Sequence, residues 1–153
     1  MVAIRPILPQ DRAAFAEFVR ELSPESRTNR FLHPVSEFAP AFLDALTRTE
    51  PGRHLCLVAE DEGRIVAEAR VVALEDGRGE FALAVADEWQ RQGIGARLLR
   101  ALVDAARRSG ITRIEGEILR TNAAMLSFVR RTGFHLSACA GDARLAMAAR
   151  TVA

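Results

Sequence analysis

One stretch of the chain places a strand, a glycine turn and a helix directly after one another. Residues 79–86 are mostly apolar and contain no proline, which is typical of a buried strand. From Ala96 onward, leucine, valine and alanine recur at helical spacing, and Gly110 follows as a C-terminal cap. Between strand and helix, Gly93 and Gly95 mark a turn where we expect unpaired backbone N–H groups. The stretch therefore predicts a phosphate-binding site at a helix N-terminus.

Two well-known phosphate-binding motifs fit this turn poorly. A P-loop has Lys followed by Ser or Thr after its second glycine, whereas this chain has Ala96-Arg97. The dinucleotide-binding pattern G-x-G-x-x-G would need glycine where Leu98 stands, and its first glycine would follow the strand directly. The pattern that does fit is Q-x-x-G-x-G, formed by Gln90, Gly93 and Gly95.

The rest of the chain predicts an α/β fold. Apolar periodicity and turn residues indicate strands at 2–7, 54–60, 64–74, 113–118, 134–136 and 144–148, and helices beginning near 11, 24, 40, 97 and 122. Strands 54–60, 64–74 and 79–86 are joined by tight turns and form an antiparallel meander, which a Rossmann domain would not place before its glycine loop. In the second of these strands, Glu68 and Arg70 are expected on the exposed face. The prediction is a mixed, mostly antiparallel central sheet with helices on both faces.

Composition narrows the classes of protein further. The 153 residues are 49% hydrophobic and carry a net charge of +1, which favours a single domain over residues 1–153 and disfavours nucleic-acid or membrane-surface binding. No signal peptide or membrane-spanning run is visible, so we expect a cytoplasmic protein. Cys56 and Cys139 lie in apolar runs and are interpreted as buried free thiols. The histidines do not cluster with them, so no metal site is expected.

These motifs, in this order, resemble the GNAT superfamily of acyl-CoA-dependent N-acyltransferases over nearly the whole chain. The chain looks most similar to the GNAT domain of bacterial protein-lysine acetyltransferases of the Pat type. Besides the Q-x-x-G-x-G loop, the resemblance is carried by Leu22–Ser26, Arg30-Phe31, Gly116–Leu119, Asn122, Met125-Leu126 and Gly133-Phe134. It implies a GNAT fold and acetyl-CoA as co-substrate. Pat-type enzymes commonly carry a second, regulatory domain that these residues do not include, so a protein lysine and a small-molecule amine both remain open as acceptors.

The resemblance also implies which residues bind the co-substrate. The loop that would bind the pyrophosphate of coenzyme A, largely through backbone amides, consists of Gln90, Arg91, Gln92, Gly93, Ile94, Gly95 and Ala96. Leu83, Ala84 and Val85 would hold the pantetheine arm by strand-like hydrogen bonds. The Val85 N–H would also polarise the thioester carbonyl. Asn122 is either a cofactor contact or a helix cap.

Transfer to an amine needs a base, because an ammonium group has no lone pair. Glu80 occupies the position of the catalytic glutamate in Pat-type sequences and is the candidate; the alternative is an ordinary solvated or ion-paired strand carboxylate. Many GNAT enzymes protonate the departing thiolate with a tyrosine, but Phe128 stands at that position and the chain has no tyrosine. This substitution leaves a second hypothesis open, namely a non-catalytic acyl-CoA-binding sensor. The sequence does not indicate an oligomeric state.

Overall fold

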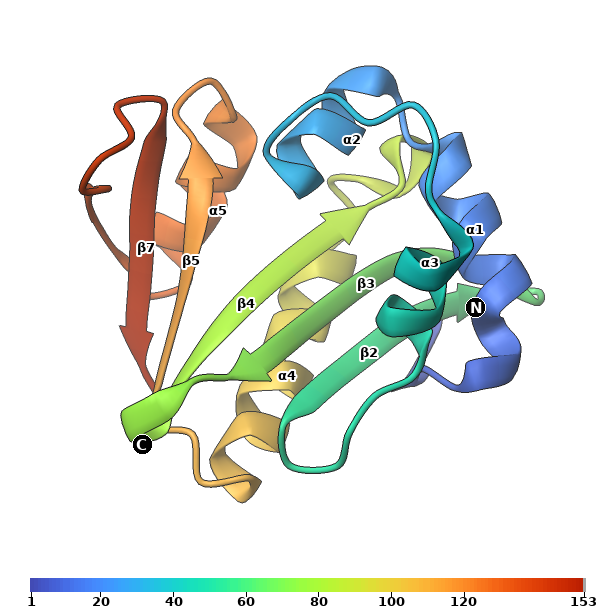
Figure 1. The fold of residues 1–153 in the computed structure, drawn as a ribbon, viewed down its shortest axis with the longest axis horizontal. Coiled ribbons are helices and arrows are strands. Elements are labelled where there is room, and N and C mark those ends of the chain that lie inside the picture. Colours follow the sequence, from blue (N-terminus) through green and yellow to red (C-terminus); the bar gives the residue numbers. More distant parts are fainter. Residues whose placement is uncertain (153) are drawn as a thin grey trace.

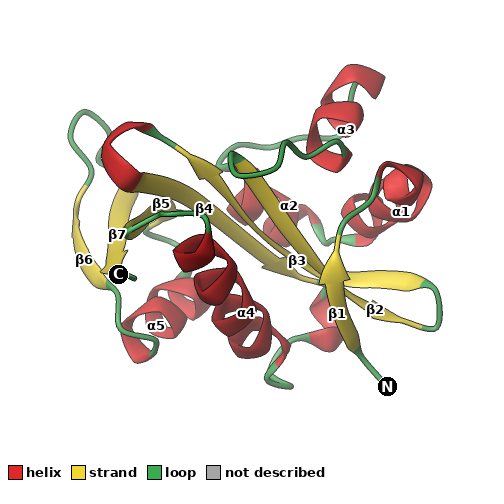
Figure 2. Cartoon of the chain, turned by 90° about the horizontal axis from the view of Figure 1, so that it is seen from below, coloured by secondary structure: helices red, strands yellow, loops and turns green. Residues whose placement is uncertain are grey.

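The computed structural model describes residues 1–152 and contains a seven-stranded sheet between two layers of helices (Figures 1 and 2). The strands are β1 Ala3–Pro6, β2 His54–Asp61, β3 Arg64–Ala73, β4 Arg78–Val85, β5 Arg113–Leu119, β6 His135–Ala138 and β7 Leu145–Thr151. They lie in the order β1-β2-β3-β4-β5-β7-β6. Only β4 and β5 run parallel; the other neighbouring pairs are antiparallel. The predicted mixed, mostly antiparallel sheet is confirmed.

The helices divide between the two faces of this sheet (Figure 2). They are α1 Arg12–Glu21, α2 Pro24–Phe31, α3 Pro40–Thr47, α4 Ile94–Arg108 and α5 Ala123–Arg131. The first three cover one face and the last two the other. The start of α2 follows the sequence prediction, because the Ser23 side chain accepts the Ser26 N–H at 3.1 Å and Pro24 occupies the first turn.

The larger core lies between the sheet and α4. Leu98 and Leu102 are fully buried on the predicted apolar face of α4, and they belong to one cluster with Phe81 and Leu83 of β4. Alternation along β4 turns Glu80 and the other even-numbered side chains toward the opposite face, as the sequence predicts. This alternation decides which side chains of β4 are free to take part in chemistry.

The sequence prediction is wrong for two charged residues of β3. Glu68 is 0% exposed and Arg70 is 4% exposed, although their alternation indicated a solvated face. Arg70 Nε donates to Glu68 Oε2 at 2.8 Å, and Arg30 of α2 donates through its Nε to Glu68 Oε1. Glu68 can be buried because it pairs with Arg70 of its own strand and with Arg30 of α2. Arg30 comes close to Glu68 only in the folded chain, so local sequence does not indicate this pair.

The sheet opens between its two parallel strands. Only residues 78–80 of β4 pair with residues 113–115 of β5, and beyond them the strands diverge (Figure 1). The Ala86 N–H donates to Val66 O at 2.8 Å, so the even-numbered residues near this end of β4 direct their backbone groups toward β3. The N–H groups of Leu83 and Val85 therefore face the opening on the β5 side. Within residues 1–152, the helices are too short or too polar to span a bilayer.

Candidate active site

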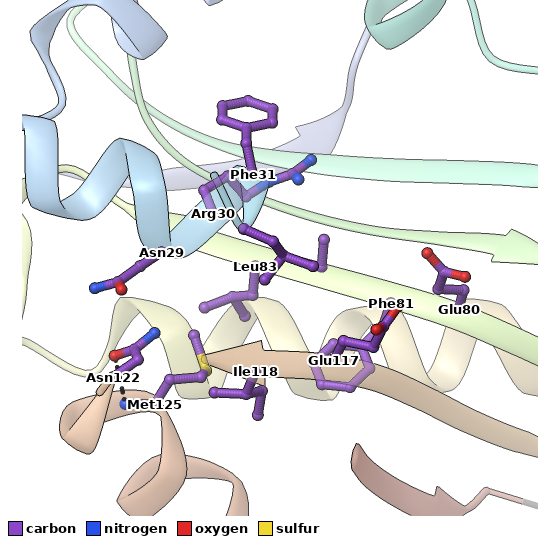
Figure 3. Close-up of a pocket in the computed structure, with 12 residues that line it drawn as sticks. Asn29, Arg30, Phe31, Glu80, Phe81, Leu83, Glu117, Ile118, Asn122 and Met125 are labelled. Carbon is purple, nitrogen blue, oxygen red and sulfur yellow. Dashed lines mark hydrogen bonds between the residues drawn. The ribbon is translucent and has the colours of Figure 1, made fainter. Parts of the chain in front are cut away.

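A cleft of about 240 Å³ lies where β4 and β5 separate (Figure 3). Its walls come from β4, β5, the C-terminal half of α2 and the start of α5. The residues that line it are Asn29, Arg30, Phe31, Leu32, Glu80, Phe81, Ala82, Leu83, Glu117, Ile118, Asn122 and Met125. Elements from distant parts of the sequence thus meet at the opening in the sheet.

The glycine turn has the backbone geometry that an anion site requires. Gly93 is the N-cap of α4 with φ 82°, a left-handed conformation that favours glycine, and Arg91 also has a positive φ of 63°. The first amide of this segment to find an acceptor is that of Arg97, which donates to Gly93 O at 3.1 Å. The amide nitrogens of residues 91–96 have no acceptor among the described residues. Consecutive free donors at a helix N-terminus attract phosphate oxygens.

Two glutamine side chains of this turn bind protein carbonyls. Gln90 Nε2 donates to Val85 O at 3.0 Å, and Gln92 Nε2 donates to Glu88 O at 3.2 Å. The first bond ties the turn to the end of β4, because Val85 is the last residue of that strand. Gln90 therefore supports the turn with its side chain, which leaves the backbone amides as the donors to a ligand.

Asp87 holds the turn against α2, and the sequence analysis missed it. Its carboxylate accepts hydrogen bonds from the Ser23 N–H at 3.1 Å, the Ser23 hydroxyl at 2.9 Å and the Ser26 hydroxyl at 3.0 Å. Burial would raise the pKa of Asp87, but these hydrogen bonds outweigh it and lower the pKa. The cap signature at Ser23 and Ser26 was visible in the sequence, whereas a partner 64 residues away was not.

Glu80 is an exposed carboxylate on the cleft wall. Its neighbour across the parallel pair, Glu115, is bound by Arg78 at 2.9 Å and lies 3.5 Å from Arg113. Glu80 itself has no ion pair or hydrogen-bond partner among residues 1–152. Of the two ordinary roles weighed for Glu80, the ion-paired carboxylate is absent among residues 1–152, and the solvated carboxylate is what the structure shows.

A second carboxylate that the sequence analysis did not single out, that of Glu117, lines the same cleft from β5 (Figure 3). The Cys139 thiol donates to Glu117 Oε2 at 3.5 Å. Alternation along β5 could have indicated this position, since it separates the glutamates from the buried isoleucines. The predicted burial holds for Cys56, where loss of solvent raises the pKa to about 12, but Cys139 is only partly buried.

Asn122 caps α5 and also faces the cleft. Its Oδ1 accepts the Met125 N–H at 3.2 Å, so the helix-cap interpretation is confirmed (Figure 3). The amide nitrogen of its side chain stays available to a ligand. Phe128, on the same helix, packs beneath the glycine turn: a methyl group added at Gly95 would lie 3.6 Å from its ring. Among residues 1–152, no group of three His, Cys, Asp or Glu side chains could hold a metal ion.

A sheet that opens between two parallel strands, next to a helix N-terminus with free amides, defines the class of acyl-CoA-dependent acyltransferases. The chain belongs to the acetyltransferase (GNAT) family, whose sequence profile matches residues 15–134. It is an acetyl-CoA-dependent N-acetyltransferase, as its named relatives also indicate. The resemblance stated from the sequence is thereby confirmed.

Several relatives can be placed beside this chain. An acetyltransferase of Pseudomonas aeruginosa is 36% identical over 138 residues, which cover 87% of this chain and 74% of that protein. The acetyltransferase Pat of Mycolicibacterium smegmatis is 31% identical over 136 residues, or 85% of this chain but only 40% of that longer protein.

Among solved structures, the GNAT domain of S. lividans PAT has a TM-score of 0.92 at 23% identity and covers 98% of this chain and 90% of its own. An N-acetyltransferase of Thermoplasma acidophilum in complex with coenzyme A has a TM-score of 0.74 at 16% identity, with 99% of each chain covered. At these identities the two structures show the fold.

Proposed function

We propose that this chain transfers an acetyl group from acetyl-CoA to a primary amine by direct attack, with Glu80 as the base. The amine nitrogen attacks the thioester carbonyl, the new C–N bond forms, and the C–S bond breaks. The Glu80 carboxylate takes one proton from the ammonium before attack, directly or through water, and the second proton that nitrogen loses on amide formation passes to water; coenzyme A leaves as a thiolate that takes a proton from solvent. The observation that carries this proposal is the opening between β4 and β5, flanked by Glu80 and by the free amides of residues 91–96.

In this proposal the co-substrate follows the edge of β4. Its pyrophosphate binds the amides of residues 91–96, and its pantetheine arm takes the place of the missing strand pairing at residues 83–85. A backbone N–H in the opening then donates to the thioester oxygen, which contributes about 3 kcal/mol to transition-state stabilisation by analogy with oxyanion-hole donors. The Asn122 side-chain amide, which lines the cleft on the β5 side, is a further contact in this proposal.

The position of Glu80 constrains where the thioester lies. A strand rises about 3.3 Å per residue, so the Val85 N–H lies about 16 Å and the Leu83 N–H about 10 Å from Glu80 along β4. A thioester bound at Val85 therefore needs a chain of water molecules between amine and Glu80, whereas one bound at Leu83 needs a shorter bridge. Both N–H groups face the opening. The shorter chain of water molecules to Glu80 favours the Leu83 N–H as the donor to the thioester oxygen.

Substitution of Glu80 tests the proposed base. We expect Glu80→Gln to lower kcat at neutral pH by about 10²–10⁴-fold, because most of the amine is protonated there. The deficit should shrink toward pH 10, where a primary amine loses its proton without help. Release of the thiol from acetyl-CoA measures the rate, and calorimetry should give the same coenzyme A affinity for both proteins. Glu75→Gln, at an exposed glutamate outside the cleft, is the matched control. Equal rates for Glu80→Gln and wild type across this pH range would remove Glu80 from the mechanism.

The acceptor is either a protein lysine or a small-molecule amine, and the same assay can test both. The similarity to Pat supports a protein lysine, although the chain spans only 40% of that relative. A panel of small amines tests the alternative in the same assay. A non-catalytic acyl-CoA sensor is the second candidate function, because Phe128 packs against the turn in place of a proton-donating tyrosine. Coenzyme A binding without turnover of any acceptor would favour the sensor.

A further inference from the structure

Arg30 lines the cleft and has two hydrogen-bond donors that no residue of the described chain uses. Its side chain is 10% exposed, stacks over the Phe31 ring at 4.7 Å and lines the cleft from α2 (Figure 3). Its Nε donates to Glu68, but its two terminal nitrogens have no acceptor among residues 1–152. A nearly buried guanidinium with two free terminal nitrogens is a geometry that suits a planar anion.

The charges around Arg30 do not balance. Glu68 is shared between Arg30 and Arg70, and it is the one carboxylate that pairs with either guanidinium within the described part of the chain. The remaining terminal nitrogen of Arg70 donates to Leu46 O at 2.9 Å and lies 3.1 Å from His54 Nε2. Burial, together with the charge of Arg70, lowers the pKa of His54, so this ring is neutral at pH 7. The cluster therefore carries two positive charges against one negative charge at the edge of the cleft.

We propose that Arg30 is a carboxylate-binding subsite of this cleft, so that one of the two substrates carries a carboxylate besides its reacting group. The inference rests on the proposed acetyl-transfer function and specifies its substrates further. An incoming carboxylate would accept hydrogen bonds from both terminal nitrogens of Arg30 and supply the negative charge that the cluster lacks. The Arg30 guanidinium is already held in position, because its Nε donates to Glu68 and its plane packs against the Phe31 ring.

Two substrates could supply the carboxylate. The acceptor would be an amine that also bears an acid group, as an amino acid does. Alternatively, the acyl donor would be a dicarboxylic acyl-CoA, such as succinyl-CoA, in addition to acetyl-CoA. The cleft contains both the free Glu80 carboxylate, which favours a cationic amine, and Arg30 on the opposite wall. A substrate pair with one ammonium and one carboxylate complements both.

Matched substrates separate these sources. With acetyl-CoA as donor, 6-aminohexanoate is compared with hexylamine; with hexylamine as acceptor, succinyl-CoA is compared with butyryl-CoA. In one of these arms we expect wild-type kcat/KM to favour the carboxylate by about 10- to 100-fold, the range of a charge-assisted pair of hydrogen bonds. Arg30→Gln should bring that ratio close to one. The ratio should persist in Arg20→Gln, an equal change of charge at an exposed ion pair on α1.

Each outcome of these substrate comparisons either supports or refutes the carboxylate subsite at Arg30. No preference in either arm, or a preference that survives Arg30→Gln, would overturn the subsite while leaving the acetyl-transfer function intact. No turnover with any pair would instead contradict the proposed function. In that case thermal unfolding with added glutarate still tests the subsite: stabilisation of wild type that Arg30→Gln loses supports it, and equal stabilisation of both proteins refutes it. Arg30→Gln is expected to fold, because Glu68 keeps its pairing with Arg70.

Discussion

Replacement of Glu68 by glutamine should lower the free energy of unfolding by about 3 kcal/mol at pH 7. Glu68 is fully buried and neutralises part of the charge of two guanidinium groups, and breaking a buried pair of this kind costs about 3–5 kcal/mol. The pKa of Glu68 gives a second route to the magnitude. Burial alone would raise this pKa, but Arg30 and Arg70 more than compensate and lower it from 4.5 to about 2. At about 1.36 kcal/mol per pH unit, this fall again corresponds to about 3 kcal/mol.

The pH dependence of that loss has a definite sign. Because the pKa of Glu68 is lower in the folded state, its stabilisation is fully present above pH 4.5 and disappears as the pH falls toward 2. Urea unfolding of wild type and Glu68→Gln between pH 7 and pH 3 should therefore show the two proteins converging in acid. Glu17→Gln, which breaks an exposed ion pair with Arg20, should change the unfolding free energy by less than about 1 kcal/mol. A Glu68→Gln protein as stable as wild type at pH 7, or a difference that does not vary with pH, would refute the reasoning.

Two further predictions concern the glycine turn and the thiols. Gly93→Ala should cost about 1–2 kcal/mol of stability and weaken coenzyme A binding in calorimetry, because φ is 82° there; Gly95→Ala, whose added methyl meets only ordinary contacts, should leave stability nearly unchanged. If the two variants unfold at the same urea concentration, the backbone argument is wrong. At pH 8, a thiol reagent should modify Cys139 in the folded protein and Cys56 only after unfolding, because Cys56 is buried with its pKa raised to about 12, whereas Cys139 is partly exposed although its pKa is raised as well. Rapid modification of both thiols in the native state would contradict this.

The sequence was sufficient to predict those helices and strands in which neighbouring residues all favour the same structure. Strand alternation in β4, helical spacing in α4 and the Ser23-Pro24 start of α2 each predict an element that the structure contains. The turn at Gly93 was also predictable, because its positive φ and its place before a helix are both properties of neighbouring residues.

Features that depend on distant partners were not predictable from local pattern. Glu68 looked like a solvated strand residue because its partner Arg30 comes from a helix 38 residues earlier in the chain. The separation of β4 from β5 after residue 80 leaves no trace in residue types. Alternation along β5 separates Glu117 from the buried isoleucines, but the divergence of β4 and β5 that opens the cleft beside it is not a property of the local sequence.

The scarcity of pairing between β4 and β5 also has a mechanical meaning. The sheet consists of two antiparallel halves, β1 to β4 and β5 with β7 and β6, and their strands pair only over residues 78–80 and 113–115, next to the bond from the Thr112 N–H to Gly77 O. A ligand that pairs with the free N–H groups of Leu83 and Val85 would extend the contact between these two halves. Binding of such a ligand would therefore also stabilise the two halves of the sheet against separation.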